Sequence, residues 1–420
     1  MRLTGAAIAL AFCLSPPAHA ESIAEAARWA VEYHPDVRVL SANRDAVREE
    51  LAAARGLGLP GVRLEGNYGA LNTAQGGFFG TGDIAIKLKQ PIYKGGRIKA
   101  ERERQQARVS SAGNRLQDTI DTVALQAIQA YFEVVRAGRV LTKSRRNVDM
   151  VRGIVQRVRT RVAGGAGTNA DLSQAEARLH AANNSLAVAE LQHADAQALY
   201  LTATGRNAGR LEQADLPRHH LPRSIREVLQ RSRNASPKLA AVRFDAQAAE
   251  AAIDSARAVF RPQVDLELSS GLYGRQSLGQ THRQEHSAMV QVSWSLFNGG
   301  IDRARLREAR KRAEEANAQI ETAQLSIARE IRLSWNTYRS FQEQVSHLLK
   351  QRDANNRLRD TRINQYDSGL ASLISILDAQ NEAYVSDIQA TNVYNSGRFA
   401  FYKLLAASGL LSDALDLPRL

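Results

Sequence analysis

Hydrophobic residues recur in the first half of the chain at alternating spacings of four and three. The run extends from residue 116 to residue 162, and Ser144 is its only polar member. Its positions are Leu116, Ile120, Val123, Ala127, Ala130, Val134, Ala137, Leu141, Ser144, Val148, Val151, Val155, Val158 and Val162. A sustained mean step of 3.5 residues predicts the seam of a coiled coil, since a globular helix has a wider apolar face. A helix over residues 97–161 would be about 95 Å long.

A second run with the same step occupies residues 306–327 and resumes at Ile331 after one extra residue. An insertion of this kind locally unwinds a supercoil. The pattern therefore predicts a second long helix with one irregularity in its seam.

Four other stretches alternate apolar and polar residues with a period of two. They are residues 62–71, 84–88, 264–268 and 289–297. This period predicts strands with one apolar and one polar face. The loops between them predict two β-hairpins, at about residues 61–95 and 262–297. A tilted strand of about ten residues crosses the hydrocarbon layer of a bilayer, so the hairpins suit a membrane. A soluble hairpin packed on helices is the alternative.

Each hairpin ends in a double glycine, Gly95-Gly96 and Gly299-Gly300. Two glycines let the backbone turn sharply from a strand into the following helix. An aromatic residue precedes each pair, Tyr93 and Phe297, and aromatic rings suit the interface between membrane and water.

Each long helix is followed by a glycine and then by a hydroxyl residue. Gly165 precedes Thr168, and Gly369 precedes Ser372. Glycine closes a helix end by adopting a left-handed conformation, and a hydroxyl residue caps the helix that follows. Residues 97–204 and 301–408 are therefore predicted to be antiparallel helical hairpins whose tips lie at these glycines.

These features recur at nearly constant offsets, so the chain is predicted to be a duplication. Gly165 and Gly369 stand 204 residues apart, and Pro35 and Pro237 stand 202 apart. The predicted repeats cover residues 21–204 and 223–408, joined by residues 205–222 and followed by a tail at 409–420. Each repeat begins with one helix, at residues 21–57 and 224–259.

The first 20 residues are predicted to be a signal peptide. Arg2 gives a positive start, residues 6–14 form an apolar run, and Ala18-His-Ala20 resembles a cleavage site. The mature protein would begin at Glu21, outside the cytoplasm. Cys13 is the single cysteine of the chain and would be removed with the signal. No lipid anchor is expected, because Phe12 is too large for an acylation site.

The chain is basic, with a formal net charge of +13. Its arginines are spread along the predicted helices, which is typical of solvated helix faces, so no nucleic-acid partner is predicted. No phosphate-binding loop, nucleophile elbow or metalloprotease motif is present, and an enzyme is not predicted. No cofactor or metal is expected. His219-His220 lies in the predicted joint without carboxylate neighbours.

Four amphipathic strands cannot close a barrel, since the smallest membrane barrels need about eight. Open sheet edges are not tolerated in lipid. Several chains must therefore contribute four strands each, and an oligomeric barrel continued by long helices is a channel.

The residues quoted above resemble the TolC family of outer-membrane efflux and secretion channels, over essentially the whole mature chain. The most specific match is the segment from Tyr366 to Gln380. The resemblance implies a mainly α fold with transmembrane β-strands. Duplicated helical hairpins would form a periplasmic α-barrel, and four strands per chain would contribute to a trimeric 12-stranded outer-membrane β-barrel. It also implies outer-membrane lipid, a periplasmic adaptor, and an inner-membrane pump or ABC exporter as partners.

The resemblance also implies a gate at the helical tips. Tyr366 matches the gate tyrosine, Asp171 the gate aspartate, and Asp378 the inner of two aspartate rings that narrow the pore. Ser375 stands where the outer ring would be, and Ala371 replaces the gate arginine, so the family's lock cannot form in the same way. Gly165, Gly369 and Leu370 match the tip that contacts the adaptor. For Asp378 the alternative is an ordinary surface carboxylate, and for the glycines it is helix capping.

Two other classes of protein are considered. A periplasmic coiled-coil adaptor would have one helical hairpin flanked by β-rich domains, whereas two hairpins are predicted here. A secreted structural helical protein leaves the paired β-hairpins unexplained. The favoured function is a passive exit duct of a tripartite efflux or type I secretion system. The predicted absence of a lipid anchor at the N-terminus slightly favours type I secretion.

Overall fold

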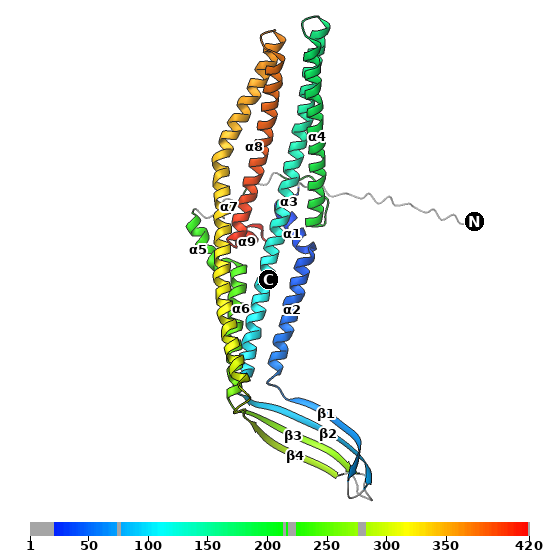
Figure 1. The fold of residues 1–420 in the computed structure, drawn as a ribbon, viewed down its shortest axis with the longest axis vertical. Helices are drawn as coiled ribbons and strands as arrows, with labels where there is room; N and C mark the ends of the chain where they lie inside the picture. The colour runs from blue at the N-terminus through cyan, green and yellow to red at the C-terminus, as the bar shows by residue number, and fades with distance from the viewer. Residues whose placement is uncertain (1–20, 74–76, 213–215, 217–223, 276–282, 419–420) are drawn as a thin grey trace, which may run out of the picture. The chain divides into compact units, whose positions relative to one another are not determined.

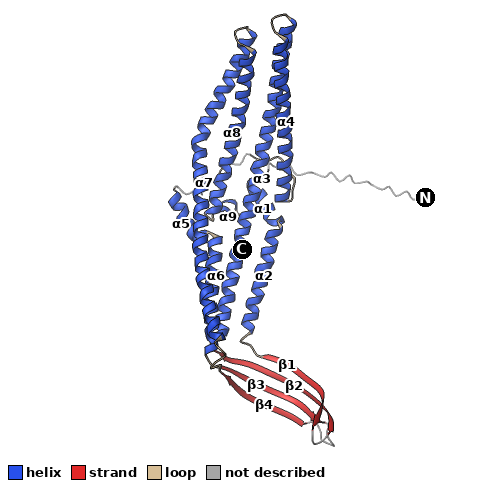
Figure 2. Cartoon of the chain, viewed as in Figure 1, coloured by secondary structure: helices blue, strands red, loops and turns tan. Residues whose placement is uncertain are grey.

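The structure is a computed structural model that describes residues 21–73, 77–212, 216, 224–275 and 283–418. It divides into two compact units. Unit 1 holds the described residues of the ranges 1–34, 121–225 and 331–419, and unit 2 holds those of 35–120 and 226–330. Helices and strands are shown in Figures 1 and 2. His219 and His220 lie outside the described residues, as does the predicted signal peptide.

The helices are α1 (Ile23–Tyr33), α2 (Pro35–Gly56), α3 (Arg97–Ala163), α4 (Asn169–Thr204), α5 (Ile225–Ala235), α6 (Pro237–Arg257), α7 (Ile301–Asp367), α8 (Leu373–Ala407) and α9 (Leu411–Leu415). The strands are β1 (Gly61–Thr73), β2 (Gly77–Lys94), β3 (Gln263–Arg275) and β4 (Arg283–Ser293). Within the described residues, no helix combines the length and apolar character that a membrane-spanning helix needs.

In unit 2 the four strands form one antiparallel sheet in the order β1-β2-β3-β4. The central pair, β2 and β3, comes from different repeats and places Leu88 opposite Leu268. β1 and β4 are the edge strands. β4 ends at Ser293, so the prediction that this strand continues to Phe297 was wrong. Ser293 pairs with Gln263, the first residue of β3. The preceding Pro262 has no amide hydrogen, which removes one ladder donor beyond this pair.

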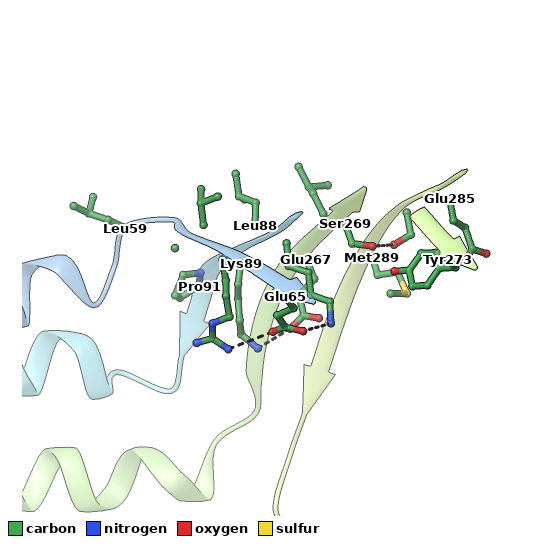
Figure 3. Close-up of a pocket in the computed structure, with 16 residues that line it drawn as sticks. Leu59, Glu65, Leu88, Lys89, Pro91, Glu267, Ser269, Tyr273, Glu285 and Met289 are labelled. Carbon is green, nitrogen blue, oxygen red and sulfur yellow. Dashed lines mark hydrogen bonds and ion pairs between the residues drawn. The ribbon is translucent and has the colours of Figure 1, made fainter. Parts of the chain in front are cut away.

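The two faces of the sheet differ in polarity, as a period of two requires. Large apolar side chains are exposed on one face, and they include Val62, Leu64, Ile84, Ile86, Leu268, Leu272, Val290 and Val292. Glu65, Lys89 and Glu267 gather on the other side of the strands from Leu88 (Figure 3). On that polar face Lys89 lies 2.6 Å from Glu267, beside a hollow of about 830 Å³.

The double glycines have the conformation that a sharp turn needs. Gly95, Gly96, Gly299 and Gly300 all have φ between +64° and +95°. A Cβ atom on Gly95 would lie 2.4 Å from the carbonyl oxygen of Ala258, closer than any side chain allows. Gly95 is therefore required both for its backbone angle and for close packing.

The prediction of one helix at the start of each repeat was wrong, because each of these segments is two helices. His34 separates α1 from α2, and Ser236 separates α5 from α6; both have extended backbones, with ψ of 129° and 116°. A proline follows each of them, and proline disfavours the helical conformation of the residue before it. Ser236 also caps α6 through its side chain.

The predicted seam of α3 is buried along most of its length in unit 1, and Val162 at its end is half-buried. Val123, Ala127, Val134, Ala137, Val148, Val151, Val155 and Val158 are each less than 9% exposed. Ser144, the polar exception, is fully buried and lies 2.9 Å from the hydroxyl of Tyr384 on α8. A buried hydroxyl needs such a partner.

Candidate functional site at the helical tips

Both tips in unit 1 close with the same backbone hydrogen bonds. Ala166 donates to the carbonyl of Arg161, and Leu370 donates to the carbonyl of Gln365. Gly165 and Gly369 have φ of +76° and +80°, the left-handed conformation that ends a helix in this motif. Leu370, next in sequence to Gly369, is 80% exposed. Each tip therefore presents a rigid turn, and the second also presents an apolar side chain.

Asp171 caps α4 at the first tip. Its carboxylate accepts hydrogen bonds from the hydroxyl of Thr168 at 2.7 Å and from the amide of Thr168 at 3.1 Å. The Thr168 hydroxyl accepts from the Asp171 amide in return, which completes a capping box. The hydrogen bonds from the side chain and backbone of Thr168 lower the pKa of Asp171, and the charge of Arg161 lowers it further.

Arg161, in the last turn of α3, reaches across to the end of α7. Its guanidinium lies 4.8 Å from the ring centre of Tyr366 and donates a hydrogen bond of 2.9 Å to the carbonyl oxygen of the same residue. One turn earlier on α3, Arg157 lies 3.3 Å from the carboxylate of Asp367. Two arginines thus connect the end of α3 to consecutive residues at the end of α7.

The Tyr366 ring is itself part of an apolar cluster. It is 6% exposed and packs with Val155 and Val158 of α3, Ala175 of α4, and Ile376 of α8. All four helices of the two hairpins therefore contribute to one small core beneath the tips. Beside it, a groove of about 720 Å³ is lined by Gly153, Arg157, Arg161, Tyr366 and Gly369, among others.

Asp378 lies on α8, and its side chain is 57% exposed. Arg178 of α4 approaches it at 3.6 Å, so a cation stands beside the carboxylate predicted to form a charged ring. Ser375, three residues earlier, donates its hydroxyl to the carbonyl of Ser372 at 2.7 Å. Ala371 packs against the apolar cluster and carries no charge.

Further from the tips, polar side chains connect α3 to α8. Gln380 donates to Asn147 at 2.8 Å, and Lys143 lies 2.6 Å from Asp387. With the contact between Ser144 and Tyr384, these pairs occur at intervals of about one turn along α8 and lie within residues 143–147 of α3. Buried polar pairs of this kind fix the register of neighbouring helices.

Unit 1 thus brings Tyr366 and Asp171 to its tips, where Arg161 contacts Tyr366 and its charge acts on Asp171. The carboxylate of Asp171 is engaged with Thr168, and the described contacts of Tyr366 are with Arg161 and the apolar cluster. Sequence reasoning missed Arg161, Arg157 and Arg178. The sequence gives one hint of the role of Arg161, because this residue stands four positions before Gly165. The hint does not single it out, because many other arginines also lie near the tips.

Comparison with known proteins assigns the chain to a family. The family model described as outer membrane efflux protein matches residues 28–206 and 228–410, which together are most of the sequence. The chain belongs to the outer membrane efflux protein family. The two matched segments lie largely within the two predicted repeats, and the gap between them, at residues 207–227, overlaps the predicted joint at 205–222.

Curated relatives of this efflux family are similar along most of the chain. The Brucella suis outer membrane efflux protein BepC is 23% identical over 383 residues, covering 90% of this chain and 84% of that protein. The outer membrane protein TolC of Vibrio cholerae is 22% identical, covering 95% of this chain and 93% of its own length.

A solved structure of the same fold is the outer membrane protein VceC of Vibrio cholerae. It has a TM-score of 0.81 at 17% identity and covers 92% of this chain and 96% of that one. The predicted resemblance to the TolC family, the fold class and the outer-membrane location are therefore confirmed. The predicted exit-channel function is confirmed at the level of the family, and the coiled-coil adaptor alternative is not favoured.

Proposed function

We propose that three copies of this chain form the outer-membrane exit duct of a tripartite export system. This proposal rests mainly on the four-stranded sheet of unit 2. One of its faces is apolar and exposed, its other face is charged, and the outer edges of β1 and β4 are unpaired within the described chain. An exposed apolar face suits lipid, and unpaired edges must be closed by neighbouring copies.

Three copies provide twelve strands, enough to enclose a water-filled lumen. The polar face of the sheet, with Lys89 and Glu267 ion-paired across strands, would line this lumen. The apolar face would contact the membrane. The long helices would continue the duct into the periplasm, where the tips would meet a periplasmic adaptor and an inner-membrane pump or ABC exporter.

Gly165, Gly369 and Leu370 are the proposed adaptor contacts. The two glycines hold rigid turns, and Leu370 offers the exposed apolar side chain that a docking contact needs. The groove lined by Gly153, Arg157 and Tyr366 beside the second tip supports docking there.

The proposed gate combines Tyr366, Asp171, Asp378 and Ser375 with Arg161. Ala371 leaves no cation at the position where the family has an arginine. The guanidinium on the Tyr366 ring is supplied instead from the first repeat, by Arg161. The gate would therefore be held within each copy by a contact between its two hairpins.

The family consists of transport conduits, and passive conduction requires no catalytic residues. The class of cargo would be determined by the inner-membrane pump that the duct serves. Relatives at comparable identity are named for pyoverdine export, at 22%, and for alkaline protease secretion, at 26% over 194 residues. The proposal therefore covers both small molecules and proteins, with type I secretion preferred on the predicted N-terminus.

Single-channel current in planar bilayers tests the duct and its gate together. The wild type is expected to form small, cation-selective pores that divalent cations block, because a ring of three Asp378 carboxylates attracts cations. Asp378→Asn should relieve the block. If the divalent block is the same in this variant, the channel proposal stands, but the constriction lies at other residues. Assembled trimers that never insert would refute the channel.

A further inference from the structure

The chain changes abruptly from apolar to basic where β4 leads into α7. Trp294, Leu296 and Phe297 follow the strand, and the last two are 80% and 85% exposed. After the double glycine, residues 303–312 contain six arginines or lysines, all of them exposed. All of these residues belong to unit 2, and Figure 1 shows β4 leading into the lower end of α7.

Three of the arginines lie on one face of α7. Arg303, Arg307 and Arg310 are spaced by four and three residues, which aligns them along about 10 Å of helix. In the described part of the chain, no carboxylate forms an ion pair with any of the three, whereas Lys311 and Arg312 are paired with Glu314 and Glu315. We call these three residues the arginine row.

The first repeat shows what is missing. At the offset of 204 residues that relates Gly95 to Gly299, Lys99 corresponds to Arg303 and Glu103 to Arg307. Lys99 and Glu103 lie 3.8 Å apart and attract each other. The second repeat replaces this pair with two cations one turn apart, which repel each other and destabilise the helix unless an anion lies between them.

The surroundings indicate which anion fits. Val290 and Val292 are exposed on the apolar face near the end of β4, and Trp294 and Leu296, which follow the strand, are exposed as well. This apolar line extends from the proposed lipid-facing side of the sheet to within seven residues of Arg303. Side chains of a helix lean toward its N-terminus, which for α7 is the end next to the sheet. The guanidinium groups therefore lean toward the level at which the apolar line ends.

We propose that the arginine row and the apolar segment 294–297 bind anionic phospholipid in the periplasmic leaflet of the outer membrane. The guanidinium groups would hold the headgroup phosphate, which arginine recognises through paired hydrogen bonds. Leu296 and Phe297 would contact the acyl chains just above the headgroups. A headgroup layer is about 5–8 Å thick, so it spans most of the row. This inference rests on the proposed placement of the sheet in the membrane.

Titration of purified trimers with short-chain phosphatidylglycerol, followed by native mass spectrometry, tests the site. The variant carries Arg303→Gln, Arg307→Gln and Arg310→Gln. Each arginine removed is expected to weaken binding about fivefold, and high salt should weaken wild-type binding. The control carries Arg329→Gln and Arg332→Gln, exposed arginines of the same helix about 30 Å further along. It should bind like the wild type.

Two further arms separate the sources of binding. Glycerol phosphate, which lacks acyl chains, should compete poorly, and Leu296→Ser with Phe297→Ser should weaken lipid binding while leaving the charge intact. Equal binding by the wild type and the triple variant overturns the inference. If the triple variant dissociates into monomers in the absence of lipid, the inference is also overturned. The arginine row would then form ion pairs with carboxylates of a neighbouring copy. Wild-type protein that fails to insert into bilayers refutes the duct instead.

Discussion

At the residue scale, Arg161 connects the two repeats at the tips. It stacks on a tyrosine from the other repeat and hydrogen bonds to the backbone of that residue. The hydrogen bonds from Thr168 lower the pKa of Asp171, and the charge of Arg161 adds to this effect. A stacked guanidinium contributes about 1 kcal/mol when partly desolvated. In the proposed trimer three such contacts would act together at the proposed gate.

Replacing Arg161 with alanine is therefore expected to raise single-channel conductance. Losing about 1 kcal/mol per copy shifts the ratio of open to closed tips about fivefold for each copy. Arg152→Ala is a matched control, because Arg152 is an exposed arginine of the same helix whose ion pair is with Asp149, three residues away. Unchanged conductance in Arg161→Ala would show that this contact does not hold the gate.

Arg178 provides a second test at this scale, because it partly neutralises Asp378 at 3.6 Å. Exposed ion pairs contribute about 0.2–1 kcal/mol. Arg178→Ala should therefore tighten divalent block of the pore by about twofold to fivefold. Arg159→Ala, which removes an exposed pair with Glu176, should leave the block unchanged. A weaker block in Arg178→Ala would contradict this argument and would mean that Arg178 holds Asp378 in the position that attracts cations.

Acid should loosen the first tip through Asp171. Its pKa is lowered from 3.8 in the folded chain by the hydrogen bonds from Thr168. The stabilisation is therefore fully present above the usual pKa and is lost as the pH falls through the lowered value. Amide exchange across residues 168–172 should accelerate in that acidic range, and Asp171→Ala should abolish the acceleration. If amide exchange in Asp171→Ala accelerates in acid as it does in the wild type, another group must be responsible for the acid sensitivity.

At the scale of elements, α7 and α8 meet at a glycine. A Cβ atom on Gly397 of α8 would lie 1.8 Å from the Phe341 ring of α7, so no side chain fits there without displacing that ring. The ring also packs edge-on against Tyr394. The close approach of these helices therefore depends on a residue that weakens a helix by itself.

Gly397→Ala is expected to destabilise the fold by about 1–3 kcal/mol through overpacking. Gly113→Ala in α3 is the matched control, since a Cβ atom there meets nothing within 4 Å. That substitution should stabilise the helix by about 0.5–1 kcal/mol. Thermal unfolding followed by circular dichroism measures both. Similar shifts for the two variants would contradict the close-packing argument.

Regular periodicity made the helices and strands predictable from the sequence. The contacts between individual side chains were not predictable in this way. The spacing around Val134 and Val148 defined a buried seam, because burial follows directly from helical period. Pro35 was noticed, yet the break at His34 was missed, since the helical pattern continues on both sides of it. Arg161 could not be selected among the many arginines near the tips, because its partner Tyr366 lies 205 residues away. Long-range pairing of this kind leaves no periodic signal.

At the scale of the whole molecule, the open edges of the sheet predict a closed ring of three copies. The chain has one cysteine, Cys13, in the predicted signal peptide, so introduced cysteines can be read without interference. A cysteine at Leu64 of β1 can be combined in turn with one at His286, Ala288, Val290 or Val292 of β4. Disulfide-linked products should stop at trimers, and the most efficient position would report the stagger between copies.

Cysteines at Ile86 and Ser270 provide the control for this experiment. These residues face each other on β2 and β3 of one chain, so their disulfide should leave monomers on a denaturing gel. Higher ladders from the Leu64 combinations would indicate an open-ended assembly instead of a closed ring.

The pairing of β2 with β3 has a consequence for the order of folding. Lys94 and Gln263 meet although they stand 169 positions apart in the sequence, and the first helical hairpin lies between them. Closing so long a loop is slow while it is unstructured, and local helical contacts form much faster. We expect the helical hairpin to assemble first and to bring the ends of the two strands together. In the proposed duct, formation of the sheet and membrane insertion would then follow assembly of the helical hairpin, so its apolar face would not form before that stage.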